Sequence, residues 1–300
     1  MLLPAKASPF SSAMRRQAPW RSSPEPRAAS MSRRSTRTGT PPVPVQGCAS
    51  GVALSSALGI GVSPDGKNVY LVSPGFVAVF ARARSGALTQ LAGNAGCLSA
   101  DGSDGADGSC AAVPVLDGST GIAVSPDGRD VYVAAPFASA VVVLARDPRS
   151  GRLTSRSGPA GCVSADGSDG QCAQGRALDG VSAVATSRDG KSVYATASSA
   201  NAVLAFARGA NGVLRQLPRA AGCVSDGGSG GACTSGRSLV GPQALVVSPD
   251  GRNIYASAVQ ASGGFVTYDS LDTFRRQVPA PALPKCRKGQ KSTKQHACRK

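Results

Sequence analysis

The sequence predicts an all-β fold built from four copies of one structural repeat. The first observation is a motif of the form Ser-x-Asp-Gly, flanked by apolar stretches, that occurs four times. The second is composition, because 37 glycines and 21 prolines favour strands and turns over a helical bundle. The third is that no helical pattern of about 10–15 residues separates the apolar stretches, which argues against a doubly wound α/β fold.

Each copy consists of an apolar stretch, a turn and a second apolar stretch. The four copies read GIGVSPDGKNVYLVS (Gly59–Ser73), GIAVSPDGRDVYVAA (Gly121–Ala135), AVATSRDGKSVYATA (Ala183–Ala197) and ALVVSPDGRNIYASA (Ala244–Ala258). Their tyrosines, Tyr70, Tyr132, Tyr194 and Tyr255, are 62, 62 and 61 residues apart. A fixed period of this length is typical of repeat architectures.

Four strands are expected in each copy. In the second copy, Gly121–Val124 is the first strand and Val131–Ala134 the second, joined by a turn in which Pro presets φ and Gly accepts a positive φ. The third strands are expected at Phe76–Ala81, Ala140–Ala145, Ala202–Ala207 and Gly264–Tyr268. The shorter, more polar fourth strands are expected at Ala87–Leu91, Arg152–Ser155, Val213–Leu217 and Thr273–Val278, where polarity suits an outer edge.

Four antiparallel strands in the same hairpin order form one blade of a β-propeller. A β-sandwich is the alternative, but a sandwich has no reason to repeat at this period. We therefore predict a β-propeller of four ~62-residue, four-stranded blades, which closes alone, pairs with a second copy or stays an incomplete, open array. The predicted domains are a disordered basic segment at 1–46, the repeats at 47–280 and a basic, cysteine-containing tail at 281–300.

Paired cysteines occur in the Gly-, Ser- and Asp-rich loops between copies and in the C-terminal tail. Local disulfides are expected because short, pliant loops close at modest entropic cost. The expected pairs are Cys97 with Cys110, Cys162 with Cys172, Cys223 with Cys233, and Cys286 with Cys298. Free thiols and zinc are the alternatives, although the loop cysteines are farther apart than those of a zinc knuckle and no histidine accompanies them. Cys48 has no neighbour and is predicted to be a free thiol or to pair with another chain.

A calcium site is a second interpretation of the first cysteine loop. Asp101, Asp104 and Asp107 stand at every third residue there, and calcium prefers several oxygen ligands at a tight turn. The spacing differs from that of an EF-hand and no glutamate follows, while the third loop keeps only Asp226. We therefore expect a plain disulfide-closed loop without metal or cofactor.

The net charge of +16 comes from the two ends of the chain. Residues 1–46 hold eight basic residues and one acid, residues 275–300 hold nine basic residues and no acid, and residues 47–274 hold 16 of each. A folded nucleic-acid binder would carry the basic patch on its domain. The basic ends predict solvated tails that can contact a polyanion by charge.

General acid–base chemistry has few candidate residues in the repeats. The single glutamate (Glu25) and the single histidine (His296) both lie in the tails. Histidine is the commonest general base because its pKa lies near neutrality. Any catalytic site in the repeats must therefore use Asp, Arg, Lys, Tyr, Ser or Cys, and no catalytic residue is assigned.

The motif VSPDG-x-x-VY, followed by VAVFAR-like strands and then SGxLT, resembles the repeats of the YVTN/lactonase-type β-propeller family. The GC-V-S…C loops look like an actinobacterial-style subgroup of these repeats. The resemblance covers about residues 47–280. It implies a 6-phosphogluconolactonase-like fold and, in the best-known members, seven blades and lactonase activity. Those enzymes are expected to use Glu, His and Arg in a central funnel, and the repeats here lack the first two.

Two functions follow from these expectations. The first is a secreted, non-catalytic propeller that binds a protein, a glycan or a cell-envelope ligand, or acts as a scaffold. The alternative is a lactonase-like hydrolase that opens a sugar-acid lactone ring with Arg and Asp near the channel.

Location and partners are predicted from the cysteines and the blades. Four cysteine pairs favour an extracellular or cell-envelope location, although no signal peptide is recognisable in residues 1–46. A start annotated at the wrong place, or a longer repeat protein of which this is a fragment, would explain that. A homodimer through unpaired blades is a further expected partner arrangement.

Overall fold

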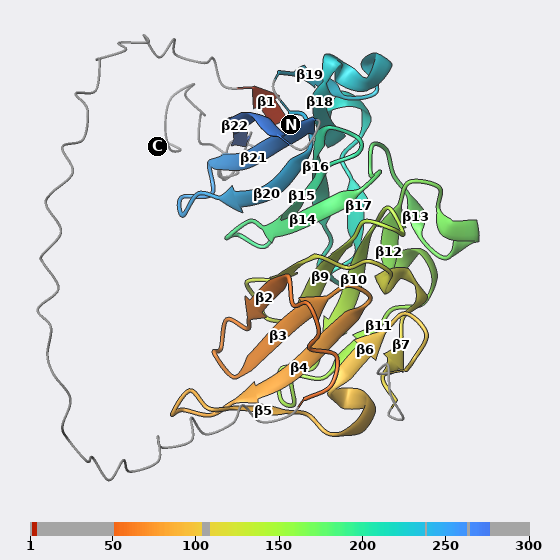
Figure 1. The fold of residues 1–300 in the computed structure, drawn as a ribbon, viewed down its shortest axis with the longest axis vertical. Coiled ribbons are helices and arrows are strands. Elements are labelled where there is room, and N and C mark those ends of the chain that lie inside the picture. The colour runs from red at the N-terminus through yellow and green to blue at the C-terminus, as the bar shows by residue number, and fades with distance from the viewer. Residues whose placement is uncertain (1, 5–50, 104–108, 238, 263–264, 277–300) are drawn as a thin grey trace, which may run out of the picture. The chain divides into compact units, whose positions relative to one another are not determined.

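The computed structural model describes residues 2–4, 51–103, 109–237, 239–262 and 265–276 (Figure 1). The chain divides into two units, one of residues 6–51, of which only Gly51 is described, and one of residues 1–5 and 52–300. Every strand described lies in the second unit. The all-β prediction is confirmed, since the described residues form strands and short 3-10 turns.

Four sheets follow one another along the chain, and each is one blade of a β-propeller. The first blade contains β2 (Gly59–Val62), β3 (Asn68–Ser73), β4 (Phe76–Arg82), β5 (Leu88–Gln90), β6 (Cys97–Ser99) and β7 (Ala111–Ala112). The second contains β8 (Gly121–Val124), β9 (Asp130–Ala135), β10 (Ala140–Arg146), β11 (Leu153–Ser155), β12 (Cys162–Ser164) and β13 (Ala173–Gln174). The third contains β14 (Val181–Thr186), β15 (Ser192–Ala197), β16 (Ala202–Arg208), β17 (Leu214–Gln216), β18 (Cys223–Asp226) and β19 (Thr234–Gly236).

These three blades have six strands each, where the sequence predicts four. The additional strands come from the cysteine loops. In the first blade, β5 pairs with the end of β4, β6 pairs antiparallel with the start of β4, and β7 runs parallel to β6. The two short strands β5 and β6 thus share the fourth position of the blade, and β7 adds a fifth position.

Glycine explains why the fourth position is divided. Between β5 and β6 the chain leaves the sheet through the 3-10 turn Gly93–Ala95 and returns at Gly96. A Cβ on Gly96 would lie 1.9 Å from the carbonyl oxygen of Leu91, so only glycine fits. Gly161 and Gly222 occupy the same position in the next two blades, at 2.3 and 2.1 Å from a carbonyl oxygen. The Gly-Cys pairs of the sequence therefore mark re-entry into the sheet.

The fourth blade differs from the other three. It contains β20 (Pro242–Val247), β21 (Asn253–Ser262) and β22 (Phe265–Arg276), with β1 (Leu2–Pro4) beside β22. The third and fourth strands expected at Gly264–Tyr268 and Thr273–Val278 are therefore wrong, because their described residues belong to one continuous strand. The reason is local, since the segment between them lacks the Ser-Gly or Asn-Gly turn of the other copies. Leu2–Pro4 belong to the segment 1–46, the rest of which lies outside the described residues.

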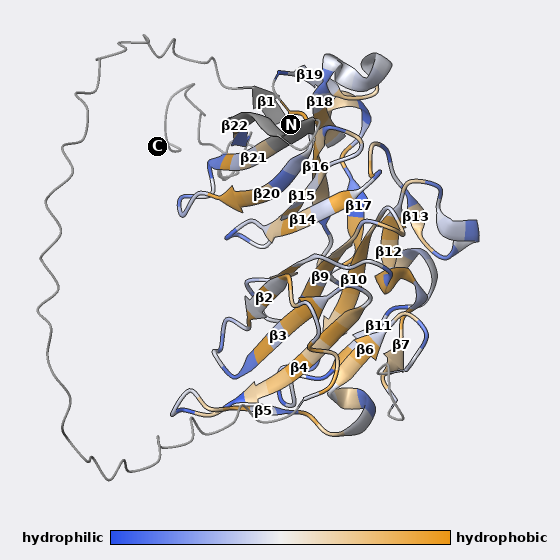
Figure 2. Cartoon of the chain, in the orientation of Figure 1, coloured by the Kyte–Doolittle hydropathy of each residue, from blue (hydrophilic) through white to orange (hydrophobic). Residues whose placement is uncertain are grey.

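The core lies between successive blades. One cluster joins Tyr132 and Val141 of the second blade to Val184, Val193 and Phe206 of the third. A second cluster joins the first blade to the second in the same way, and a third joins the third to the fourth. Figure 2 shows the apolar strands, such as β3, β4, β9 and β10, that supply these layers. Each blade thus depends on its neighbour to cover one face.

Three disulfides close the cysteine loops at the edges of the first three blades. They join neighbouring cysteines of one loop: Cys97 to Cys110, Cys162 to Cys172, and Cys223 to Cys233. In each pair the first cysteine stands at the start of β6, β12 or β18, and the second stands just before β7, β13 or β19. The bridges therefore hold the two parallel strands of each loop together.

Removal of one bridge should lower stability measurably. We expect the double variant Cys162→Ser with Cys172→Ser to lose about 2–3 kcal/mol of unfolding free energy, because a short closed loop is released in the unfolded chain. Urea unfolding followed by circular dichroism measures this loss. Reduction of the unaltered chain, which opens every bridge, should lower the midpoint further. An unchanged midpoint in both cases would contradict a stabilising role for the loops.

Candidate functional site

Each Ser-x-Asp-Gly turn holds its aspartate side chain in a position from which it can contact the next blade. In the first copy the Oγ of Ser63 donates to Asp65 at 2.5 Å and accepts from the backbone N–H of Asn68 at 2.9 Å. The Lys67 N–H also donates to Asp65, at 3.2 Å. Ser125 with Asp127 and Ser187 with Asp189 repeat this arrangement. The turn therefore fixes the carboxylate in place before any partner approaches.

An arginine at the end of the third strand binds this carboxylate from the next blade. The Arg146 guanidinium is 3.0 Å from the Asp65 carboxylate and donates to the Asn68 side chain at 2.6 Å. Its Nε donates to the Tyr70 hydroxyl at 2.6 Å, and that hydroxyl donates to the Gly151 carbonyl at 2.9 Å. One buried guanidinium thus joins the turn, the second strand and the tyrosine of the preceding blade.

The same contact recurs at the next two blade junctions. Arg208 donates to the Tyr132 hydroxyl at 2.7 Å and to Asp127 at 2.8 Å, and it also pairs with Asp130. Arg276 donates to Asp189 at 2.9 Å and to Ser192 at 3.1 Å. We call these three groups the junction clusters. They are centred on Arg146, Arg208 and Arg276 in turn.

The junction clusters shift the pKa of the groups they contain. Burial opposes ionisation of Asp65, but hydrogen bonds from Ser63, the Lys67 N–H and Arg146 lower its pKa to about 2. The pKa of Asp189 falls to about 2 in the same way, with Arg276 as its cationic partner. Burial raises the pKa of Tyr70 to about 12 and raises that of Tyr132 and Tyr194 as well. None of these groups is poised to exchange a proton near neutral pH.

The edge strands β2, β8, β14 and β20 lie beside one another, blade against blade. Their residues are Gly59–Val62, Gly121–Val124, Val181–Thr186 and Pro242–Val247, and none of these is ionisable. Hydroxyls link the strands, since Thr120 donates to the Ser182 carbonyl and Ser182 to the Pro242 carbonyl, both at 2.7 Å. The Arg and Asp that lactone opening would need are therefore absent from these four strands.

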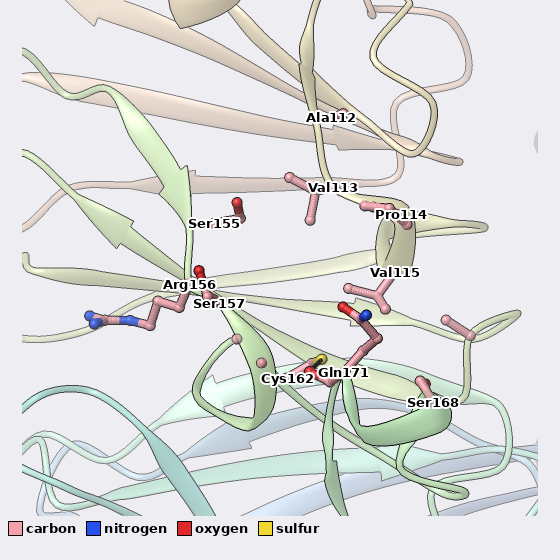
Figure 3. Close-up of a pocket in the computed structure, with 13 residues that line it drawn as sticks. Ala112, Val113, Pro114, Val115, Ser155, Arg156, Ser157, Cys162, Ser168 and Gln171 are labelled. Atoms are coloured by element: carbon pink, nitrogen blue, oxygen red, sulfur yellow. Dashed lines mark hydrogen bonds between the residues drawn. The ribbon is translucent and has the colours of Figure 1, made fainter.

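A cavity of about 590 Å³ lies between the first and second blades (Figure 3). Its apolar wall is formed by Val113, Pro114, Val115 and Ala138. The polar wall comes from β11 and the second cysteine loop and contains Ser155, Arg156, Ser157, Ser168 and Gln171. The size is that of an ordinary ligand pocket.

The charge of Arg156 is directed away from this cavity. In Figure 3 its guanidinium points away from the other lining side chains. It pairs with the buried carboxylate of Asp130 at 2.5 Å. The remaining polar groups of the lining are hydroxyls, one amide and backbone, so the cavity presents no unpaired charge among its lining residues.

The cysteines and aspartates singled out in the sequence have different positions. Six of the cysteines form three disulfides, each within the edge of one blade. Cys48, Cys286 and Cys298 lie outside the described residues, as do Asp104 and Asp107. Asp101 binds the backbone and hydroxyl of Ser103, which lower its pKa.

The described part of the chain gives no metal or membrane feature. It holds no group of three or more His, Cys, Asp and Glu residues that could bind a metal ion. No helix within it is long and apolar enough to span a membrane.

The junction arginines were not singled out in the sequence, and Arg276 was counted with the basic tail. The sequence does contain a pattern that indicates these arginines. The third strands of the first three copies end in Arg82, Arg146 and Arg208, which follow the tyrosines of their copies by 12, 14 and 14 residues, and the long strand of the fourth copy ends in Arg276. A charge that recurs at the end of the same strand in successive repeats indicates a contact between repeats.

Comparison with known proteins gives similarity of fold only. No family model matches the sequence, and no curated protein matches it. Among solved structures, hydrazine synthase of Kuenenia stuttgartiensis is 18% identical over 76% of this chain and 52% of its own, with a TM-score of 0.45. A functionally unknown protein of Desulfotomaculum acetoxidans is 17% identical over 68% of this chain and 52% of its own, with a TM-score of 0.44. The periplasmic gluconolactonase of Pseudomonas aeruginosa is 18% identical over 74% of this chain and 58% of its own, with a TM-score of 0.41. The chain spans about half the length of these structures.

Loss of one junction arginine should destabilise the whole protein. We expect Arg146→Met to cost about 3 kcal/mol of unfolding free energy, because it leaves Asp65, Asn68 and Tyr70 without their shared donor. Arg152→Met is the matched control, since Arg152 is an exposed arginine of the same blade. Chemical unfolding of both variants measures the difference. Equal, small losses would show that the cluster contributes little.

Acid should weaken the junction clusters. A carboxylate with a folded pKa of about 2 stabilises the fold above its unfolded pKa, which is near 4, and that contribution is lost as the pH falls through about 2. Unfolding free energy should therefore drop between about pH 4 and pH 2, and this drop should be smaller in Asp65→Asn and Asp189→Asn. Urea titrations across this range test it. Parallel pH profiles for wild type and both variants would refute the assignment.

Proposed function

We propose that this protein is a non-catalytic binding module of the extracellular or cell-envelope space. The observation that carries the proposal is the placement of its charged groups. At the blade junctions Arg, Asp and Tyr neutralise and satisfy one another. The edge strands of the blades contribute no ionisable side chain. The residues described thus supply architecture and surfaces rather than a poised acid, base or nucleophile.

The cavity between the first two blades is the proposed binding site. Its wall of Val113, Pro114, Val115 and Ala138 suits an apolar group, while Ser157 and Gln171 offer hydrogen bonds. Binding pockets commonly combine an apolar lining with a few polar groups that fix orientation. An uncharged segment of a partner protein, anchored by one apolar side chain, fits this lining.

The disulfides support the location. Local disulfides persist in oxidising compartments and are rare in the reducing cytosol. Three of them close successive loops of this chain. An extracellular or envelope location places the binding cavity within reach of surface partners.

Hydrolysis of a sugar lactone is the second candidate, because the repeat motif resembles that of lactonase-type propellers. It would require Arg and Asp that are accessible to the substrate. Arg146 and Arg208 are instead largely buried and bound to Asp65, Asp127 and Asp130. The geometry therefore favours the binding function.

An activity assay separates the two candidates. We expect the purified chain to open glucono-δ-lactone and 6-phosphogluconolactone no faster than buffer does, because the cavity and edge strands lack a free acid or base. Proton release followed with a pH indicator gives the rate. Turnover above background that survives purification would overturn the non-catalytic assignment.

The binding site is tested with short peptides displayed on phage and selected against the full chain. Val115→Arg places a charge in the apolar wall and should weaken the selected peptides by about tenfold or more, since an unpaired charge is costly to bury. Val52→Arg is the matched control, because Val52 is 40% exposed and does not line the cavity. Failure to select any peptide, or equal binding by both variants, would contradict this site.

A further inference from the structure

Every internal blade uses two different faces. Its front face carries the junction arginine and packs on the preceding blade. Its back face carries the Ser-x-Asp-Gly aspartate and the repeat tyrosine, and it packs on the following blade. In the second blade, for example, Arg146 belongs to the front face and Asp127 and Tyr132 belong to the back face. The front face of the first blade and the back face of the fourth have no blade of this chain to pack on among the described residues.

The front face of the first blade leaves apolar side chains exposed. Ile60 and Val62 are 64% and 54% exposed. Their counterparts Ile122 and Val124 pack against the core between the first and second blades. Leu88 is 47% exposed, whereas its counterparts in the next two blades, Leu153 and Leu214, are 1% exposed. Ala53 and Leu54 cover only the part of this face near the first disulfide.

The arginine of this face is Arg82. It occupies the position of Arg146 and Arg208 at the end of the third strand. Within the described part of the chain its guanidinium donates only to the Gly66 carbonyl of its own blade, at 3.3 Å. The same bond to the blade's own glycine is made by Arg146, to Gly128 at 2.8 Å. Arg82 is thus already oriented as a junction arginine.

The back face of the fourth blade shows the complementary features. Leu271 is 72% exposed, whereas its counterparts Val77, Val141 and Val203 are fully buried. Val246, on the edge strand β20, is 59% exposed. Tyr255 is partly exposed, whereas the other three repeat tyrosines are at most 3% exposed.

Asp250 completes this back face. It is held by Ser248 and by the Arg252 N–H, as Asp65 is held in the first blade. Among the described residues no arginine side chain forms an ion pair with it, although the charge of the neighbouring Arg252 lowers its pKa. The Asp250 carboxylate is therefore held in a position from which it can bind a guanidinium of a following blade.

We propose that the back face of the fourth blade binds the front face of the first blade in a second copy of this chain. Arg82 of one copy then takes the place that Arg146 holds within a chain, with Asp250 and Tyr255 of the other copy as its acceptors. The apolar residues of the two faces, Leu271 and Val246 against Ile60, Val62 and Leu88, form the dry part of the contact. This inference does not depend on the proposed function.

A second copy fits these faces better than an unrelated partner. Both surfaces are halves of a junction that the chain already forms three times between its own blades. The positive group lies on the front face of the first blade and the negative group on the back face of the fourth, so the front face of one copy complements the back face of another. Such head-to-tail contacts close when the rotation allows it, and two copies would bring together eight blades, within the range of known propellers.

The test is sedimentation equilibrium of the full chain over a range of concentrations. We expect a dimer or a larger head-to-tail assembly that Arg82→Glu and Asp250→Arg each weaken by about tenfold or more, because like charges then face each other. The double variant Arg82→Glu with Asp250→Arg should recover part of the association, since the pair is restored with its charges exchanged. Arg152→Glu, an equal charge change on an exposed residue, should leave it unchanged.

Thermal unfolding of each variant shows whether the single substitutions fold. Recovery in the double variant supports the contact even if Asp250→Arg alone is unstable. A monomer at every concentration would overturn the proposal, and so would a dimer that Arg82→Glu leaves intact. A dimer that persists on a non-reducing denaturing gel would assign the association to cysteine instead. A monomer to which additional blade repeats bind in place of a second copy would also overturn it.

Discussion

The junction between successive blades depends on a guanidinium that reaches across it. A single small sheet cannot bury both of its faces, so each blade is stable only against a neighbour. Arg146 fixes how that neighbour sits, because it binds the turn, the second strand and the tyrosine of the preceding blade together. Its directional hydrogen bonds set the register that apolar packing alone would leave loose.

Small residues make this arrangement possible at the edge strands. A Cβ on Gly59 would meet the Thr120 carbonyl oxygen at 2.9 Å, and one on Gly121 would meet the Ala183 Cα at 2.9 Å. The edge strands of adjacent blades therefore approach so closely that these positions admit no larger side chain. The chain contains only 4% aromatic residues, which agrees with cores built from Val, Ala and Leu.

The repeat made the strand order predictable, and Gly121–Val124 is a strand with the bounds expected from the turn that follows it. The divided fourth strand was missed because its cause, the approach of Gly96 to Leu91, exists only once the sheet has formed. The long strand β22 does not follow from the repeat, because the fourth copy lacks the Ser-Gly or Asn-Gly turn that ends the third strand of the other copies. The cavity was not predictable, since Val115 and Ser157 are brought together by packing between blades.

The cysteine loops connect this architecture to the proposed site. Ser168 and Gln171 line the cavity from the glycine-rich second cysteine loop. The bridge between Cys162 and Cys172 closes that loop around them, so it limits the positions that both side chains can take. Such pre-organisation reduces the entropy lost on binding. The bridge therefore acts on ligand affinity as well as on the stability of the blade, and loss of this bridge should weaken binding even where the blade stays folded.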